Sequence, residues 1–171
     1  MRMKCTMEHR FGWPLDQLAP LLANEELVDF EDLPNVSKRK FLERRREGNK
    51  IYKVCEWNVH GQIPKAAQRL IRPEMLTFTE YTVWDDGDCT FDSRIEPHFL
   101  KNILKCGTRS RWSAAGPDKT NRRIDMVIEV RIPIIGQLVE GTIIDHMKKN
   151  TEKSTEVLRG VLTRRLGPPS A

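Results

Sequence analysis

The sequence predicts an α+β fold in which a curved antiparallel sheet of about seven strands wraps around one long C-terminal helix. Three observations carry this prediction. A strand-like segment and two short helical segments open the chain, six more strand-like segments follow, and residues 133–166 have the spacing of a one-faced helix. Strands joined by tight turns pair antiparallel, so the final helix is expected to cover one face of the sheet. Residues 1–171 are expected to form one such domain.

The first segment, residues 3–11, alternates between apolar and polar side chains, as a half-buried strand does. Pro14 then favours a short helix that extends to Leu22. Asn24 can cap a second short helix from residue 25 to about residue 30. His9 falls on the apolar side of the strand, where a hydrogen-bonded structural histidine is favoured over a catalytic base.

The middle of the chain is predicted to be almost entirely strand. The expected strands are residues 36–46, 51–60, 75–84, 89–96, 103–114 and 122–132. Turn-forming sequences at 47–50, 85–88 and 116–118 favour hairpins between neighbouring strands. The one interruption is the segment 61–73, where Pro64 can begin a short helix and Pro73 can end it.

The C-terminal helix has an unusual apolar face. A proline at its start and a glycine after its end set its expected bounds at 133–166. Val139, Ile143 and Met147 form a stripe that continues onto Asn150 and Ser154, which are small and polar. Two interpretations remain open at this point. The helix lies over a cavity, or its middle turn projects past the sheet into water.

Composition narrows the function classes. The net charge is +5, from 29 basic and 24 acidic residues, and the basic residues cluster at 38–40 and 44–46. A solvated strand face is favoured over a surface for nucleic acid or anionic lipid. No segment is long and apolar enough to span a bilayer, and the basic N-terminus lacks the apolar run of a signal peptide, so we expect a cytoplasmic location. The four cysteines lack paired spacing, so we expect reduced thiols, with no metal and no cofactor.

Catalytic motifs are not recognised. The sequence has no nucleotide-binding loop, no hydrolase nucleophile motif and no zinc-protease motif. His60 ends a predicted strand near the expected cavity mouth and is therefore the histidine favoured for a ligand contact. Glu80 and Asp125 fall in the middle of strands, and we expect both to point outward. An inward carboxyl would need a partner or would have a raised pKa, as in acid–base cyclases.

The element order is that of the helix-grip arrangement, in which a curved sheet encloses a long helix. The residues that carry a family resemblance are Glu8-His9-Arg10-Phe11, Trp57, Ile63-Pro64, Leu70-Ile71, residues 77–84 and residues 132–140. In these the chain resembles the START-like (SRPBCC) superfamily, most closely an uncharacterised bacterial family of that clan. It resembles the PRELI/MSF1 lipid-transfer family more distantly. The resemblance implies the fold and a ligand cavity, but this superfamily hosts carriers, receptors, cyclases and chaperone cofactors.

We therefore expect a protein that binds a hydrophobic small molecule or lipid, with transport of that ligand as an extension of the same function. The expected cavity-lining residues are His60, Trp57, Phe78, Tyr81, Phe91, Trp112, Val139, Ile143, Met147, Asn150 and Ser154. Two alternatives stay open: a cyclase or isomerase that uses the same cavity, and a protein-binding module with a filled core. An inward carboxylate with His or Tyr would favour the enzyme, and an empty apolar cavity would favour the carrier.

The segment 61–73 has one apolar and one basic side, which predicts either a lid or a structural cap. The residues involved are Ile63, Lys65, Arg69, Leu70, Ile71 and Arg72. A short segment of this kind can move as a unit over a pocket. Its basic side could also contact an anionic membrane surface.

Overall fold

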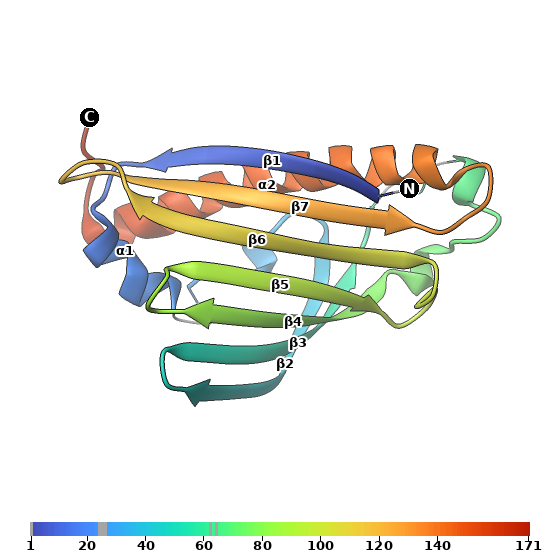
Figure 1. Ribbon diagram of the computed structural model, residues 1–171, viewed down its shortest axis with the longest axis horizontal. Coiled ribbons are helices and arrows are strands. Elements are labelled where there is room, and N and C mark those ends of the chain that lie inside the picture. Colours follow the sequence, from blue (N-terminus) through green and yellow to red (C-terminus); the bar gives the residue numbers. More distant parts are fainter. Residues whose placement is uncertain (1, 24–26, 62, 64) are drawn as a thin grey trace.

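The computed structural model describes residues 2–23, 27–61, 63 and 65–171 (Figure 1). Within these residues, seven strands and two α-helices form the fold, with short 3₁₀ turns in the connections. The strands are β1 (Arg2–Phe11), β2 (Val36–Glu47), β3 (Lys50–Val59), β4 (Thr77–Asp85), β5 (Thr90–Pro97), β6 (Leu104–Ala114) and β7 (Thr120–Val130). The helices are α1 (Leu15–Leu22) and α2 (Gly136–Leu166), and the 3₁₀ turns are η1 (Phe30–Asp32), η2 (Lys65–Ala67) and η3 (Pro73–Met75).

All strands belong to one antiparallel sheet with the order β1-β7-β6-β5-β4-β3-β2. The predicted seven-stranded sheet and long helix are thus confirmed. α2 lies along one face of the sheet next to β1 and β7, and β2 and β3 form the far edge (Figure 1). Because successive side chains of a strand alternate between faces, only every second residue of each strand faces α2.

The long helix begins three residues later than predicted. Pro133 lies in the turn that precedes it, and α2 starts at Gly136. Ile134 has a φ of 72°, which is incompatible with a right-handed helix, so the helix cannot begin at the proline. At Gly136 the helix packs directly on the end of β7, where a Cβ would lie 2.6 Å from the carbonyl oxygen of Val130.

Two short helices were also predicted wrongly. In the first case, residues 24–26 lie outside the described residues, residues 27–29 are not helical, and η1 occupies 30–32. In the second, the segment 61–73 contains the 3₁₀ turn η2 in place of a helix, and Pro73 opens η3 rather than ending an element. Pro64 lies outside the described residues. Helix nucleation is costly, so short connecting segments such as these often form single 3₁₀ turns in place of a regular helix.

Two separate apolar clusters hold the sheet and α2 together. The first cluster, at the α1 end, contains Phe11, Trp13, Leu18, Ile51, Trp84, Trp112, Leu158 and Leu162. The second cluster, at the opposite end, contains Ala67, Ile128, Val130, Val139 and Ile144. Several polar side chains that belong to neither cluster are also buried, among them those of Ser93, Arg122 and Thr155. The polar groups on the concave face of the sheet define the candidate site.

Candidate functional site in the sheet's concave face

Glu80 is the central polar group of the concave face. It lies on β4, and its carboxylate accepts two hydrogen bonds from neighbouring strands. The indole Nε1 of Trp57 on β3 donates to Oε2 at 2.9 Å, and the hydroxyl of Ser93 on β5 donates to Oε1 at 2.5 Å. Both donors are diagonal neighbours of Glu80, because Cys55 and Ile95 are its direct partners in the register.

The surroundings of Glu80 make its ionisation difficult. Burial raises the pKa of the Glu80 carboxyl, and this effect exceeds the lowering by Ser93, Trp57, Lys53 and Arg39 together. Cys106 also lies near this carboxyl, and burial, with the charge of Glu80, raises the pKa of its thiol to about 12. The outward orientation expected for Glu80 was therefore wrong.

Tyr81 corrects a second expectation. Consecutive strand residues face opposite sides, so the inward orientation of Glu80 places Tyr81 on the convex face. The ring of Tyr81 is exposed there, and the guanidinium carbon of Arg94 lies 4.5 Å from its centroid. Tyr81 therefore does not line the interior. Asp125 points outward as expected, and it accepts a hydrogen bond from Thr6 at 2.6 Å.

The other predicted aromatic residues lie in different places. Phe78 stacks against Trp57 with ring centroids 6.4 Å apart, beside the Glu80 group. Trp112 is buried in the first cluster, and Phe91 packs against that cluster. Trp57 and Phe78, which were expected to line a cavity, thus lie next to the polar group around Glu80. Trp112 and Phe91 contribute to packing at one end of the fold.

The predicted residues of α2 are distributed along the face that packs on the sheet. Val139 is buried in the second cluster, with Ile143 and Met147 packed against it. The sulfur atoms of Met147 and Cys106 lie 3.8 Å apart. Asn150 accepts a hydrogen bond from the amide of Asn35 at 2.9 Å. Ser154 is half-buried. The middle of α2 therefore contacts the β2-preceding loop through polar groups and does not project freely into water.

Several concave residues lie deep in the fold and yet keep accessible surface. Glu80 and Cys106 lie on the concave side of the sheet, and burial raises the pKa of both side chains. Neither residue is fully buried, and the same holds for Trp57 and Met147. The two best-formed hollows lie elsewhere. One, of about 480 Å³, is lined by β1, β6 and β7 near Arg10 and Arg123, and the other lies near the C-terminus around Gly12 and Arg159.

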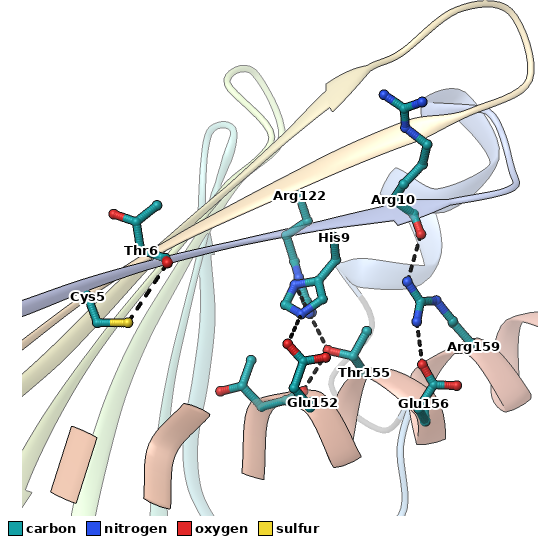
Figure 2. A network of polar contacts seen from close by, with 10 residues as sticks. Cys5, Thr6, His9, Arg10, Arg122, Glu152, Thr155, Glu156 and Arg159 are labelled. Atoms are coloured by element: carbon teal, nitrogen blue, oxygen red, sulfur yellow. Dashed lines mark hydrogen bonds and ion pairs between the residues drawn. The ribbon is translucent and has the colours of Figure 1, made fainter. Parts of the chain in front are cut away.

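A second polar group lies between β1, β7 and α2 (Figure 2). Nη2 of Arg122 donates to Nδ1 of His9 at 3.0 Å and to the hydroxyl of Thr155 at 2.5 Å. Nδ1 must accept from arginine, so Nε2 of His9 carries the proton that it donates to Glu152 at 3.0 Å. His9 is therefore a hydrogen-bonded residue of the packed interface, in line with the structural role expected for it.

Arg122 is a buried cation. Burial lowers the pKa of its guanidinium to about 10, Arg159 acts in the same direction, and Glu152 opposes them. The group therefore stays charged at neutral pH. Its guanidinium carbon lies 5.3 Å from the ring centroid of Phe11 and 5.2 Å from that of Trp112, and Nε has no hydrogen-bond partner among the described residues. The rings and Thr155 compensate for part of the lost hydration.

Of the residues predicted to lie at the cavity mouth or in its lid, only some face the interior of the fold. His60 is exposed, and its Nδ1 lies 2.8 Å from the hydroxyl of Ser37. Ile63 and Ile71 pack against the second cluster. Lys65, Arg69 and Leu70 are exposed, and Arg72 forms a 3.6 Å ion pair with Glu74. The segment 61–73 thus covers the end of the fold with its apolar side inward.

The remaining ionisable residues give no metal centre. No group of three or more potential ligands gathers in the part of the chain that the structure describes. No disulfide bond joins any two of Cys5, Cys55, Cys89 and Cys106. None of the described helices is both long enough and apolar enough to cross a membrane.

Solved structures with the same architecture define the class. The chain is similar to the Zhui aromatase/cyclase from Streptomyces sp. R1128, with a TM-score of 0.71 and 15% identity over 97% of this chain and 96% of that chain. It is similar to a START superfamily protein from Mycobacterium smegmatis, with a TM-score of 0.54 and 14% identity over 95% and 96% of the two chains. Norcoclaurine synthase from Thalictrum flavum has a TM-score of 0.63 and 10% identity over 96% and 88%. These likenesses establish a START-like helix-grip fold.

Within this class, residues 6–162 match the family described as "Protein of unknown function (DUF2505)". The chain belongs to that family. No curated protein matches the sequence. The START-like resemblance predicted from the sequence is confirmed, and the more distant resemblance to the PRELI/MSF1 family stays a prediction.

The sequence analysis missed Glu80, Ser93, Arg122 and Thr155 as interior polar residues. For Glu80 a signal was present, because Phe78, Thr82 and Trp84 share its side of a strand with period two. Thr155 gave no such signal. It is one residue from the predicted Ser154, and its role depends on an arginine that is distant in sequence.

Proposed function

We propose that the protein binds a hydrophobic small molecule that carries a polar group, between the concave face of the sheet and α2. The observation that carries this proposal is the Glu80 carboxyl, held by Trp57 and Ser93 deep inside the fold. A close-packed apolar core gains nothing from a buried carboxyl. Glu80 and Cys106 keep accessible surface on the concave side of the sheet, which supports a space next to them.

The ligand chemistry follows from the walls of this space. Trp57 and Phe78 offer aromatic surface on one side, and Met147 offers flexible apolar surface on α2. Glu80, in its protonated form, can donate a hydrogen bond to a carbonyl or hydroxyl oxygen. A compact, partly aromatic molecule fits this combination better than a long acyl chain does. A norcoclaurine synthase structure of the same fold is described in complex with dopamine and hydroxybenzaldehyde.

Catalysis is the second candidate, and a specific observation favours it. The raised pKa of Glu80 is the property of a general acid, as required of a cyclase or isomerase. His9, however, bonds to Glu152 and Arg122 rather than to Glu80. Because His9 is engaged in these other contacts, binding is the function that we infer to be supported best. The cytoplasmic location expected from the sequence stays a prediction.

The segment 61–73 is proposed to gate this space. Ala67 belongs to the second cluster and Ile63 and Ile71 pack against it, while the exposed Lys65 and Arg69 leave the outer side of the segment hydrated. The backbone is held locally, since the N–H groups of Leu70 and Ile71 both donate to the Ala67 carbonyl. Such a unit can move as one piece.

Native mass spectrometry of protein purified without added lipid tests the proposal. We expect the parent protein to retain a small molecule, Glu80→Gln to retain less of it, and Asp125→Asn to match the parent. Asp125 is the matched control, because it is a mid-strand carboxylate on the convex face. A parent protein without any retained molecule, which also fails to bind N-phenyl-1-naphthylamine, would contradict the proposal. Conversion of the retained molecule during incubation would favour the enzyme.

A further inference from the structure

Exposed apolar side chains gather at the end of the molecule that carries the second cluster. Seven large apolar residues are exposed in the part of the chain that the structure describes. Four of them, Leu70, Phe99, Ile134 and Leu138, come from three connections and the first turns of α2. These connections are the segment 61–73, the β5–β6 loop and the β7–α2 turn, which lie at one end of the fold (Figure 1). Their inner residues Ile71, Ile103 and Ile132 all pack against the second cluster. We call Leu70, Phe99, Ile134 and Leu138 the loop-end patch.

Ile134 is the most telling member of this patch. Its side chain is fully exposed, at 102%, and its φ of 72° is a conformation that β-branched residues rarely adopt. The turn around it is firmly held, because Ile135 N–H donates to the Pro133 carbonyl and Gly136 N–H to the Ile132 carbonyl. The fold therefore holds an isoleucine in solvent at a position where glycine would be more favourable.

The charges around the patch are basic. Lys65, Arg69 and Lys101 are exposed on the same connections. Arg72 and Arg131 lie there too, but they are paired with Glu74 and Glu129. Apolar side chains on protruding turns, flanked by lysine and arginine, match the interface of an anionic lipid bilayer.

We propose that the loop-end patch docks the protein onto anionic membrane surfaces, with Ile134 as its main apolar anchor. This inference does not rest on the interior site. A second copy of the chain is a poorer occupant, because the basic rims of two patches would repel each other. The patch also protrudes on separate turns, whereas a self-complementary interface needs a continuous surface.

A second basic surface, the β2–β3 hairpin, could also bind anionic membranes and therefore serves as a comparison in the test. Seven of the 29 basic and two of the 24 acidic residues lie between 36 and 50, which leaves 22 of each elsewhere. The net charge of this β2–β3 hairpin therefore equals the net charge of the whole chain. The hairpin also exposes the side chains of Phe41 and Leu42. Bulges and charges on an edge strand protect it from pairing with other strands, and the hairpin has both.

Vesicle binding separates the two surfaces. Phosphatidylcholine vesicles with and without phosphatidylserine are titrated with the parent protein and five variants. Ile134→Gly should weaken binding to anionic vesicles by about tenfold or more, since it removes the aliphatic side chain that would be buried in the membrane. The same variant should leave the melting temperature of the protein unchanged or raised. Arg69→Gln with Lys101→Gln should weaken binding by about fivefold per charge. The matched hairpin variants, Leu42→Ser and Lys40→Gln with Arg44→Gln, should bind like the parent protein.

The outcomes decide the proposal. Equal binding by Ile134→Gly and the parent would overturn it, as would a larger loss in the hairpin variants than in the loop-end variants. Absence of vesicle binding, together with dimerisation that Ile134→Gly abolishes, would assign the patch to a second copy instead. Glu80→Gln changes only the interior site and should bind vesicles like the parent. The proposal for the interior site and the proposal for the loop-end patch can therefore be contradicted independently of each other.

Discussion

The indole N–H of Trp57 donates a 2.9 Å hydrogen bond to Oε2 of Glu80, and this bond joins β3 to β4 inside the grip. An indole N–H can only donate a hydrogen bond, so Oε2 of Glu80 must be the acceptor in this contact. The hydroxyl of Ser93 holds the other oxygen from β5. Three strands thus fix the orientation of one buried carboxyl, which is the arrangement expected of a group that positions a ligand.

The first prediction concerns the pH dependence of stability. Burial raises the pKa of Glu80 above its ordinary value of 4.5, so the folded state keeps this proton to a higher pH than the unfolded state does. The contribution of Glu80 to stability therefore falls as the pH rises above that value. Glu80→Gln should therefore gain stability relative to the parent as the pH rises above about 4.5, because the glutamine has no proton to lose.

Urea denaturation at several pH values measures this difference. The control is Asp125→Asn, because the hydrogen bond from Thr6 lowers the pKa of Asp125 and Arg123 acts in the same direction. That variant should lose stability relative to the parent as the pH rises through the acid range. Parallel pH profiles for the parent protein and Glu80→Gln would show that the Glu80 carboxyl is not hindered from ionising.

The second prediction concerns the buried arginine. Thr155→Val removes the hydroxyl that accepts from Arg122 and donates to the Thr151 carbonyl at 2.6 Å. Leaving a buried guanidinium short of a partner should cost about 1–3 kcal/mol of unfolding free energy. Thr163→Val is the matched control, since its hydroxyl makes the same bond to the Arg159 carbonyl on the exposed side of α2. Equal losses in both variants, measured by urea denaturation, would contradict a role for the arginine contact.

The third prediction concerns the start of α2. Gly136→Ala places a methyl group 2.6 Å from the Val130 carbonyl oxygen, so the helix must shift. We expect a loss of about 1–3 kcal/mol. Gly160→Ala meets only the flexible end of Arg164 at 3.7 Å and should gain up to about 1 kcal/mol. Thermal unfolding distinguishes these signs, and a stabilised Gly136→Ala would show that the contact with β7 is not tight.

The fourth prediction concerns the cysteines. The pKa of the Cys106 thiol is raised to about 12 by burial and by Glu80, so little thiolate is present near pH 8. Cys106 should therefore resist iodoacetamide in the folded protein and react only after unfolding. Peptide mapping by mass spectrometry measures this. Rapid labelling of Cys106, or stoichiometric zinc in the purified protein, would contradict the account of these thiols.

Local patterns predicted most of the fold. The alternation through Ile51, Cys55 and Trp57 gave β3 its correct inward face, and tight turns gave the antiparallel order. The start of α2 was missed because proline at a first helical position is a general preference, whereas the direct packing of Gly136 on Val130 depends on tertiary contact. Propensity cannot reveal such a contact.

The site was less predictable, for two physical reasons. The hydrophobicity of the two side chains favoured Tyr81 inside and Glu80 outside. Neighbouring strand residues must face opposite sides, however, and the large apolar residues of β4 determine which side faces inward. The contacts of Arg122 join segments far apart in the chain. His9 and Thr155 meet it from β1 and α2, and no local pattern encodes that meeting.

The most direct test of the interior site is a titration with N-phenyl-1-naphthylamine, followed through the four indole N–H signals in a ¹⁵N-correlated NMR spectrum. The indole N–H of Trp57 bonds to Glu80 inside the grip, whereas that of Trp13 bonds to the Gly167 carbonyl at 3.1 Å, at the far end. We predict that the Trp57 signal shifts in a saturable manner, that Glu80→Gln weakens this binding, and that the Trp13 signal stays in place. A saturable shift of Trp13 with an unchanged Trp57 signal, or no shift of either, would contradict a ligand site at Glu80.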